Sequence, residues 1–290
     1  MDIGDYYSKS INGFTKNPLL AIPTGAGYLL MYFIMFVVMF VGFLGIYGFN
    51  PSFFSQYSTS AMDTMDLNTL STFLGILFVT MVIVGIIGWI ISCIIDAATI
   101  GMSERIVLGE KPGLNVALKY IKKYLLKLLV VSFIFGILAA IMLIPFIIGI
   151  ILIGFYPNND LIILGPIIGG LITLILLIVL FLFFIFIFQS VIIGKKSIIG
   201  SFKDSYKTVR KNIFEVVVVL IINLVISMAI GIVLAFINLF LGIIPLIGSL
   251  LALVIQIIVY AVIMPYFTLV LNYLYMDIKN MIPEESEYVY

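Results

Sequence analysis

Residues 161–193, LIILGPIIGGLITLILLIVLFLFFIFIFQSVII, decide the class of this fold, because they contain no charged side chain. About 20 apolar residues form a helix that crosses the hydrocarbon of a bilayer, so this run is long enough to span it. Similar runs recur along the 290 residues, of which 63% are hydrophobic and 10% are charged, with a mean hydropathy of +1.30. A soluble domain needs a far more polar exterior. The sequence therefore predicts an all-α polytopic membrane protein.

All fifteen Lys and Arg residues fall on one side of six predicted spans. The loops after the first, third and fifth spans contain Asp63, Asp66 and Asp160 and no basic residue. By the positive-inside rule, both termini are expected in the cytoplasm. We therefore expect a single integral membrane domain over residues 1–290, located in the cell membrane, with an acidic cytoplasmic tail at 278–290. The predicted spans are 27–47, 70–97, 125–155, 161–193, 213–237 and 243–275.

Two basic segments follow the second and fourth spans and match each other in register. Residues 119–125, KYIKKYL, align with residues 207–213, KTVRKNI. A weaker copy near the N-terminus contains Lys16-Asn17-Pro18. Because each copy leads into an apolar span, we predict an internal repeat.

Apolar side chains recur at helical spacing in these segments, next to a lysine-rich face. In the later copy, Ile199, Phe202, Tyr206, Val209 and Ile213 form such a stripe. This pattern is typical of a helix that lies in the bilayer interface. We predict six transmembrane helices in three parallel repeats, each an amphipathic interfacial helix followed by a two-helix hairpin, at about residues 3–101, 109–193 and 197–277. The residues expected to bind an anionic lipid surface are Lys119, Lys122, Lys123, Lys127, Lys203, Lys207, Arg210 and Lys211.

The two segments from Gly109-Glu110-Lys111-Pro112 through Lys123, and from Gly194-Lys195-Lys196-Ser197 through Phe214, carry a resemblance to a known group. The chain resembles an uncharacterised archaeal and bacterial family of multi-pass membrane proteins. It is also similar to the membrane domain attached to some glycerophosphodiester phosphodiesterases. The resemblance implies a helical membrane domain and transfers no catalytic residue.

Asp96 is the one acid well inside an apolar run, and an ionisable group there is a functional candidate by default. We consider it a candidate intramembrane ion or proton site. The alternative is an interfacial acid that pairs with a lysine of a neighbouring amphipathic helix. Amides inside the spans are expected to form hydrogen bonds between helices. These amides are Gln189, Asn223, Asn238, Gln256 and Asn272.

The chain has no histidine and one cysteine, Cys93. This composition excludes an intramolecular disulfide, histidine metal ligation and a Ser-His-Asp triad. No phosphate-binding loop or Cys-x-x-Cys motif occurs. We therefore expect no enzyme activity, no cofactor and no metal.

Two function classes are compatible with these features. In the first, the basic cytoplasmic face engages anionic headgroups of membrane lipids, or a membrane-protein partner or second copy of the chain, and binds no nucleic acid. In the second, the protein is a small-solute or ion transporter or channel with Asp96 in the path, which predicts flux that Asp96→Asn abolishes. The scarcity of polar residues in the spans favours the first class.

Overall fold

The computed structural model describes residues 2–47, 67–155, 164–244 and 247–283, and within these ranges it contains helices and no strand. Six helical stretches are long and apolar enough to cross a membrane, which is the makeup of a multi-pass membrane protein. Asp63, Asp66 and Asp160, in the loops after the first and third predicted spans, and the acidic end of the tail lie outside the described residues. The candidate spans are Pro18–Gly42, Leu74–Val107, Leu114–Ile153, Leu164–Ile192, Ile213–Leu241 and Ile247–Ile278.

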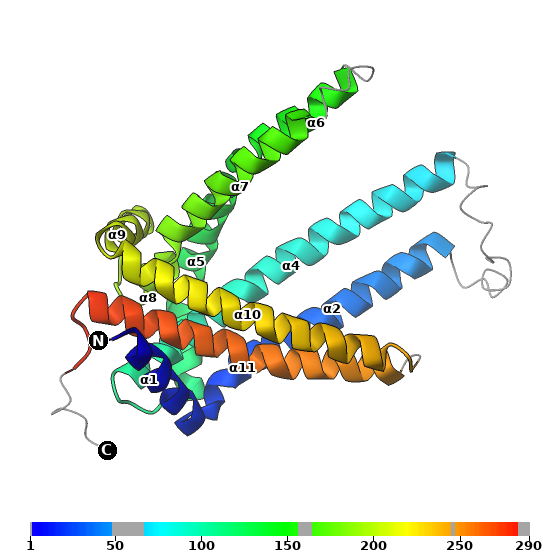
Figure 1. Ribbon diagram of the computed structural model, residues 1–290. Helices are drawn as coiled ribbons and strands as arrows, with labels where there is room; N and C mark the ends of the chain where they lie inside the picture. The colour runs from blue at the N-terminus through cyan, green and yellow to red at the C-terminus, as the bar shows by residue number, and fades with distance from the viewer. Residues whose placement is uncertain (1, 48–66, 156–163, 245–246, 284–290) are drawn as a thin grey trace.

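The long helices form three hairpins that converge at one end of the molecule and spread apart at the other (Figure 1). Helix α1 and the end of α11 both lie at the convergent end. Every Lys and Arg belongs to a segment at this end, so the charge asymmetry of the sequence is an asymmetry of the fold. The hairpins consist of α2 (Ala21–Tyr47) with α4 (Leu67–Val107), of α5 (Leu114–Met142) and α6 (Ile144–Phe155) with α7 (Leu164–Phe184), and of α10 (Ile213–Leu241) with α11 (Ile247–Ile278).

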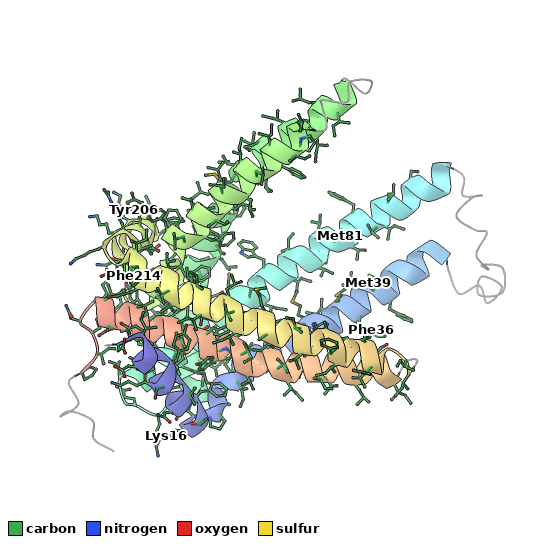
Figure 2. All side chains as sticks on the ribbon, in the orientation of Figure 1. Lys16, Phe36, Met39, Met81, Tyr206 and Phe214 are labelled. Atoms are coloured by element: carbon green, nitrogen blue, oxygen red, sulfur yellow. The ribbon has the colours of Figure 1, made fainter. Side chains whose placement is uncertain are left out.

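The hydrophobic core lies where the hairpins converge. Its largest fully buried side chains include Tyr6 of α1 and Tyr275 of α11. Farther out, large apolar side chains are exposed, such as Phe36, Met39 and Met81 on the first hairpin (Figure 2). Lipid tails are as apolar as these side chains, so exposure there carries no hydrophobic cost.

Two amphipathic helices, α1 (Ile3–Lys16) and α9 (Ile198–Lys211), have 14 residues each and end in the same way. Asn17 and Asn212 follow them with non-helical φ angles of −133° and −127°. The amide of each Asn donates to the carbonyl four residues earlier, at 3.0 and 2.9 Å. This local hydrogen bond lets asparagine compete with the helix, which separates each amphipathic helix from the span that follows.

The middle basic segment differs from the prediction. It forms the first turns of α5, which continues without a break from Leu114 to Met142. Tyr124 stands where the later copy has Asn212, and it is buried with its ring centroid 5.8 Å from that of Tyr120. A tyrosine offers the backbone no competing hydrogen bond, so the helix continues. The prediction of a separate interfacial helix before this span is therefore wrong.

Other helix ends also depart from the predicted spans. Helix α4 continues through Val107, ten residues beyond the predicted end at 97. A break at Leu143, two residues before Pro145, separates α5 from α6, whereas Pro265 lies inside α11 without ending it. Helices α6 and α7 approach so closely that a Cβ atom on Gly169 would overlap the backbone of Pro145.

Candidate functional site: two basic regions at the convergent end

Asp204 attaches α9 to two other helices. Its Oδ2 accepts hydrogen bonds from Ser190 Oγ of α8 (Ile187–Ile192) and from the Tyr275 hydroxyl of α11, both at 2.8 Å. Its Oδ1 forms an ion pair with Lys279 Nζ at 2.7 Å. Burial alone would raise the pKa of this carboxyl, but the donors and the charge of Lys279 outweigh burial, and the pKa is lowered. Asp204 therefore stays ionised and holds α9 on the bundle.

Ser205 provides a second attachment, at the break between α7 and α8. Its hydroxyl donates to the carbonyl of Phe183 at 2.9 Å and accepts from the N–H of Phe186 at 3.2 Å. These backbone groups lie at a helix break, where the regular helical partners are missing. The serine satisfies both groups, so α9 also stabilises the interrupted fourth span.

The faces of α9 point in different directions, because successive residues of a helix are about 100° apart. The face against the protein carries Ser201, Ser205 and Thr208, all buried. On the other side of the helix, about 100° to 160° around the axis from this buried face, Ile199 is 70% exposed and Tyr206 is 39% exposed. The predicted apolar stripe is thus split, since part of it packs on the protein and part points outward.

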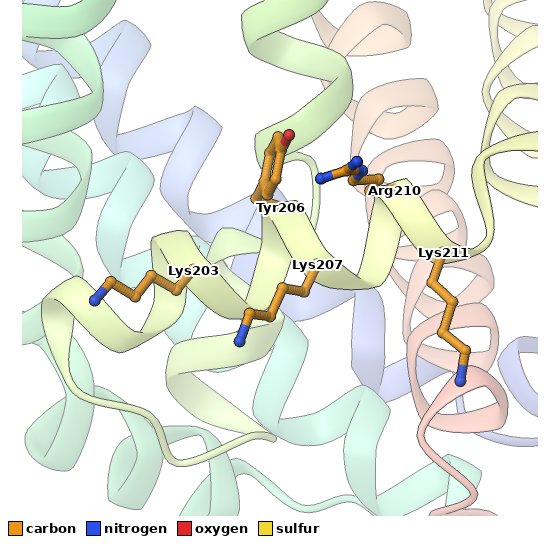
Figure 3. Close-up of a pocket in the computed structure, with 5 residues that line it drawn as sticks. All are labelled: Lys203, Tyr206, Lys207, Arg210 and Lys211. Atoms are coloured by element: carbon orange, nitrogen blue, oxygen red, sulfur yellow. The ribbon is translucent and has the colours of Figure 1, made fainter.

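The basic face begins next to Tyr206 and continues around the helix. Figure 3 shows Arg210 on the same side as Tyr206, with three lysines projecting away from it. A shallow concavity of about 430 Å³ lies on this surface, lined by Lys203, Tyr206, Lys207, Arg210 and Lys211. The structure thus brings together the four residues predicted from the later basic segment.

The four residues predicted from the earlier segment are divided. Lys119 and Lys123 line a second cavity of about 220 Å³, together with Lys195 from the α8–α9 connection. Lys122 and Lys127 are exposed and line neither cavity. Since α5 is one helix, its basic turns extend the span at the convergent end.

An acidic residue in this second cavity was missed by the sequence analysis. Glu104 is 8% exposed and accepts a hydrogen bond from the Tyr120 hydroxyl at 2.7 Å. The next residue, Arg105, pairs with Glu110 at 2.6 Å. A Cβ atom on Gly101 would overlap the ring of Tyr120, so the glycine lets that ring lie against α4. The sequence signal that could have identified Glu104 is the helical spacing of Gly101 and Glu104, a small and a polar residue, after the predicted end of the second span.

Asp96 lies half-buried on α4, close enough to Tyr28 and Cys93 for electrostatic interaction. It lines neither basic cavity, and no hydrogen bond or ion pair connects it to another residue in the described part of the chain. The geometry gives no specific support to a conducting path through this residue.

Residues 1–276 match a family described as a domain of unknown function, DUF7847. The chain belongs to this family. No curated protein and no solved structure matches it. The expected membership of an uncharacterised family is therefore confirmed, while no link to the membrane domain of glycerophosphodiester phosphodiesterases is found.

Two amides in the candidate spans of this DUF7847 member join different helices, as predicted. Asn223 accepts from the Tyr7 hydroxyl at 3.0 Å, and the Asn272 amide donates to the carbonyl of Ile100 at 3.1 Å. Burial raises the pKa of Tyr7 to about 12, so its hydroxyl remains a donor. These bonds connect α1 to α10 and α11 to α4.

A third cavity, of about 800 Å³, lies between α2 and α4 and was not predicted. Its lining is mostly apolar and includes Met31, Met35, Met39 and Met81. Trp89 lies at one end, where its Nε1 donates to Ser132 Oγ of α5 at 2.7 Å. None of the residues that line this cavity is charged.

Proposed function

We propose that both termini face the cytoplasm at the cell membrane, and that the chain is built from three parallel repeats. The equivalence of α1 and α9 supports this proposal. Their capping residues, Asp2 and Ser197 at the start and Asn17 and Asn212 at the end, are each separated by 195 positions (197 − 2 and 212 − 17). The middle copy keeps the alignment but has Tyr124 at the position of the asparagine.

Single-cysteine labelling tests the orientation, because Cys93 is the one native cysteine. In a Cys93→Ser background, Lys207→Cys on α9 should react with a membrane-impermeant maleimide in inverted vesicles and not in intact cells. Leu164→Cys, at the opposite end of α7, should show the reverse pattern. Labelling of Lys207→Cys in intact cells would contradict the proposed orientation.

We further propose that the protein is a non-catalytic membrane component that engages anionic lipid headgroups of the cytoplasmic leaflet through α9. The observation that carries this proposal is the fixed orientation of the helix. Asp204 and Ser205 attach one face to the bundle, while Ile199 and Tyr206 project outward beside the basic face. A helix in the bilayer interface needs this neighbouring pair of exposed apolar and basic faces.

Electrostatics sets the expected strength of the interaction. Each basic residue near an anionic surface contributes about 1 kcal/mol, so four contribute up to about 4 kcal/mol at low salt. The attraction weakens as salt increases, because the screening length is about 10 Å at 0.1 M. Preference for anionic over zwitterionic lipid should therefore fall with ionic strength.

Fluorescence quenching in lipid nanodiscs tests the proposal at α9 itself. The chain has one tryptophan, so a Trp89→Phe, Tyr206→Trp background places the single fluorophore beside the basic face. Brominated phosphatidylglycerol should quench it more strongly than brominated phosphatidylcholine. Replacing Lys203, Lys207 and Lys211 with glutamine should remove most of the difference, since only Arg210 of the four basic residues remains.

The matched control removes three other lysines, which line neither basic cavity: Lys111, Lys122 and Lys127. This variant changes the net charge equally and should keep the preference at position 206. If the two brominated lipids quench position 206 equally in the protein that keeps all its basic residues, the proposal is refuted.

A further inference from the structure

The cavity between α4, α5 and the α8–α9 connection is a second cationic region, separate from the face of α9. Lys119 and Lys123 reach it from α5, and Lys195 reaches it from the connection. Lys195 has a φ of 50°, a left-handed conformation that is uncommon for residues other than glycine. The N–H of the next residue bonds to the Ser190 carbonyl at 3.0 Å, which fixes this turn on the end of α8.

The charges of this cavity do not balance. Arg105 and its partner Glu110 cancel, and Glu104 offsets one of the three lysines, which leaves a net charge of +2 (3 − 1). Among the described residues, none forms an ion pair with these three lysines. Lys123 lies over the ring of Tyr124, at 5.0 Å from its centroid, but this contact does not neutralise its charge. Lysines that line one cavity without an ion pair repel one another, and an anion of matching charge removes that cost.

Buried polar groups in the wall distinguish this cavity from an ordinary basic surface. Glu104 is more than nine-tenths buried, and its carboxylate is occupied by the Tyr120 hydroxyl at 2.7 Å. The Nε of Arg105 is buried and has no hydrogen-bond partner in the described part of the chain. A buried N–H donor without an acceptor is unusual.

We propose that this cavity binds a phosphomonoester group, either on a soluble metabolite or at the end of a lipid headgroup. A phosphomonoester carries about −1.5 to −2 charges at pH 7, which matches the net charge of the cavity, and three strong acceptor oxygens. Lys119, Lys123 and Lys195 supply the compensating cations. Tyr120 keeps the Glu104 carboxylate engaged and away from the phosphate oxygens. This site does not depend on the proposed role of α9.

Thermal unfolding of the purified full-length chain, followed by a thiol-reactive dye at Cys93, tests the proposal. One arm adds glycerol 1-phosphate, with dimethyl phosphate at equal ionic strength as the diester control. The other arm adds phosphatidic acid to the micelles, with phosphatidylglycerol as the diester control. A ligand that binds only the folded state raises the unfolding midpoint. We expect the monoester to raise the midpoint more than the diester does in at least one arm. That arm shows whether the phosphomonoester belongs to a soluble metabolite or to a lipid.

Two variants locate the site. The triple variant Lys119→Gln, Lys123→Gln, Lys195→Gln should weaken monoester binding at least tenfold. Tyr120→Phe keeps every lysine but releases the Glu104 carboxylate, and it should also weaken binding.

The matched control replaces Lys203, Lys207 and Lys211 on α9 and should bind the monoester as the unmodified protein does. Three results would overturn the proposal: no midpoint shift in either arm, equal shifts from monoester and diester, or loss of the shift in the α9 control. The last two would indicate a diffuse response to anions.

Discussion

Replacing Asp204 with asparagine should destabilise the fold by about 2–4 kcal/mol. Removing one partner of a buried ion pair costs about 3–5 kcal/mol, because the other charge stays buried. We reduce this range because the side chain of Asp204 is 14% exposed and that of Lys279 is 25% exposed. The asparagine side chain keeps one carbonyl oxygen that can accept a hydrogen bond. Its NH₂ group replaces the other carboxylate oxygen and cannot accept from the remaining donors. The loss therefore combines an unpaired ammonium with at least one unsatisfied hydroxyl.

Cys93 supplies the assay, since it is the one cysteine and is 1% exposed. A thiol-reactive dye reports its exposure as purified protein is heated in detergent. A loss of this size should lower the midpoint by about 5–10 °C. Glu110→Gln is the matched control, because it also removes one carboxylate of a short ion pair. This pair is more exposed, with 32% of the Arg105 side chain and 54% of the Glu110 side chain accessible. Exposed pairs contribute at most about 1 kcal/mol.

The effect should depend on pH in a defined direction. The pKa of Asp204 is lowered from its ordinary value of 3.8, so the ionised carboxylate stabilises the folded state above that pH. The stabilisation is lost as pH falls through the folded-state pKa. The midpoint difference between wild type and Asp204→Asn should thus be constant near neutral pH and narrow below about pH 4. Equal midpoints for Asp204→Asn and Glu110→Gln near neutral pH would refute the reasoning.

Three further changes test the packing of the bundle. Ser205→Ala should cost about 1–3 kcal/mol in the same thermal assay, because it leaves the Phe186 N–H and a neighbouring carbonyl unsatisfied at a helix break. Gly169→Ala should cost at least about 1–3 kcal/mol, since its methyl group would overlap the Pro145 backbone. Gly170→Ala is the control and should cost less, because its methyl group would make only ordinary contacts. Tyr7→Phe should cost about 1 kcal/mol through the loss of its hydrogen bonds to α10, and an unchanged midpoint would contradict this role.

Much of the fold follows from hydropathy, because a lipid solvent imposes a simple rule on a long apolar run. Each such run must satisfy its backbone internally, and a helix does so. The six spans were therefore predictable, as was the one-sided placement of the basic residues. Helix ends were less predictable. The amphipathic segments end where asparagine stands at the junction with the span, at 17 and 212, and the helix continues where tyrosine stands there, at 124.

The basic face of α9 was predictable because its residues are local in sequence and share one helical period. The second cavity was not, because it needs α4 to continue ten residues past its predicted end and α5 to begin eleven residues before its predicted start. Only then does Glu104 meet Tyr120, sixteen positions later, and only the turn at Lys195 brings in the third lysine. A hydropathy pattern ends a span where polar residues begin. In this protein the polar ends of two spans remain helical and pack together, so the candidate site lies where the sequence predicted a loop after the second span and a separate interfacial helix before the third.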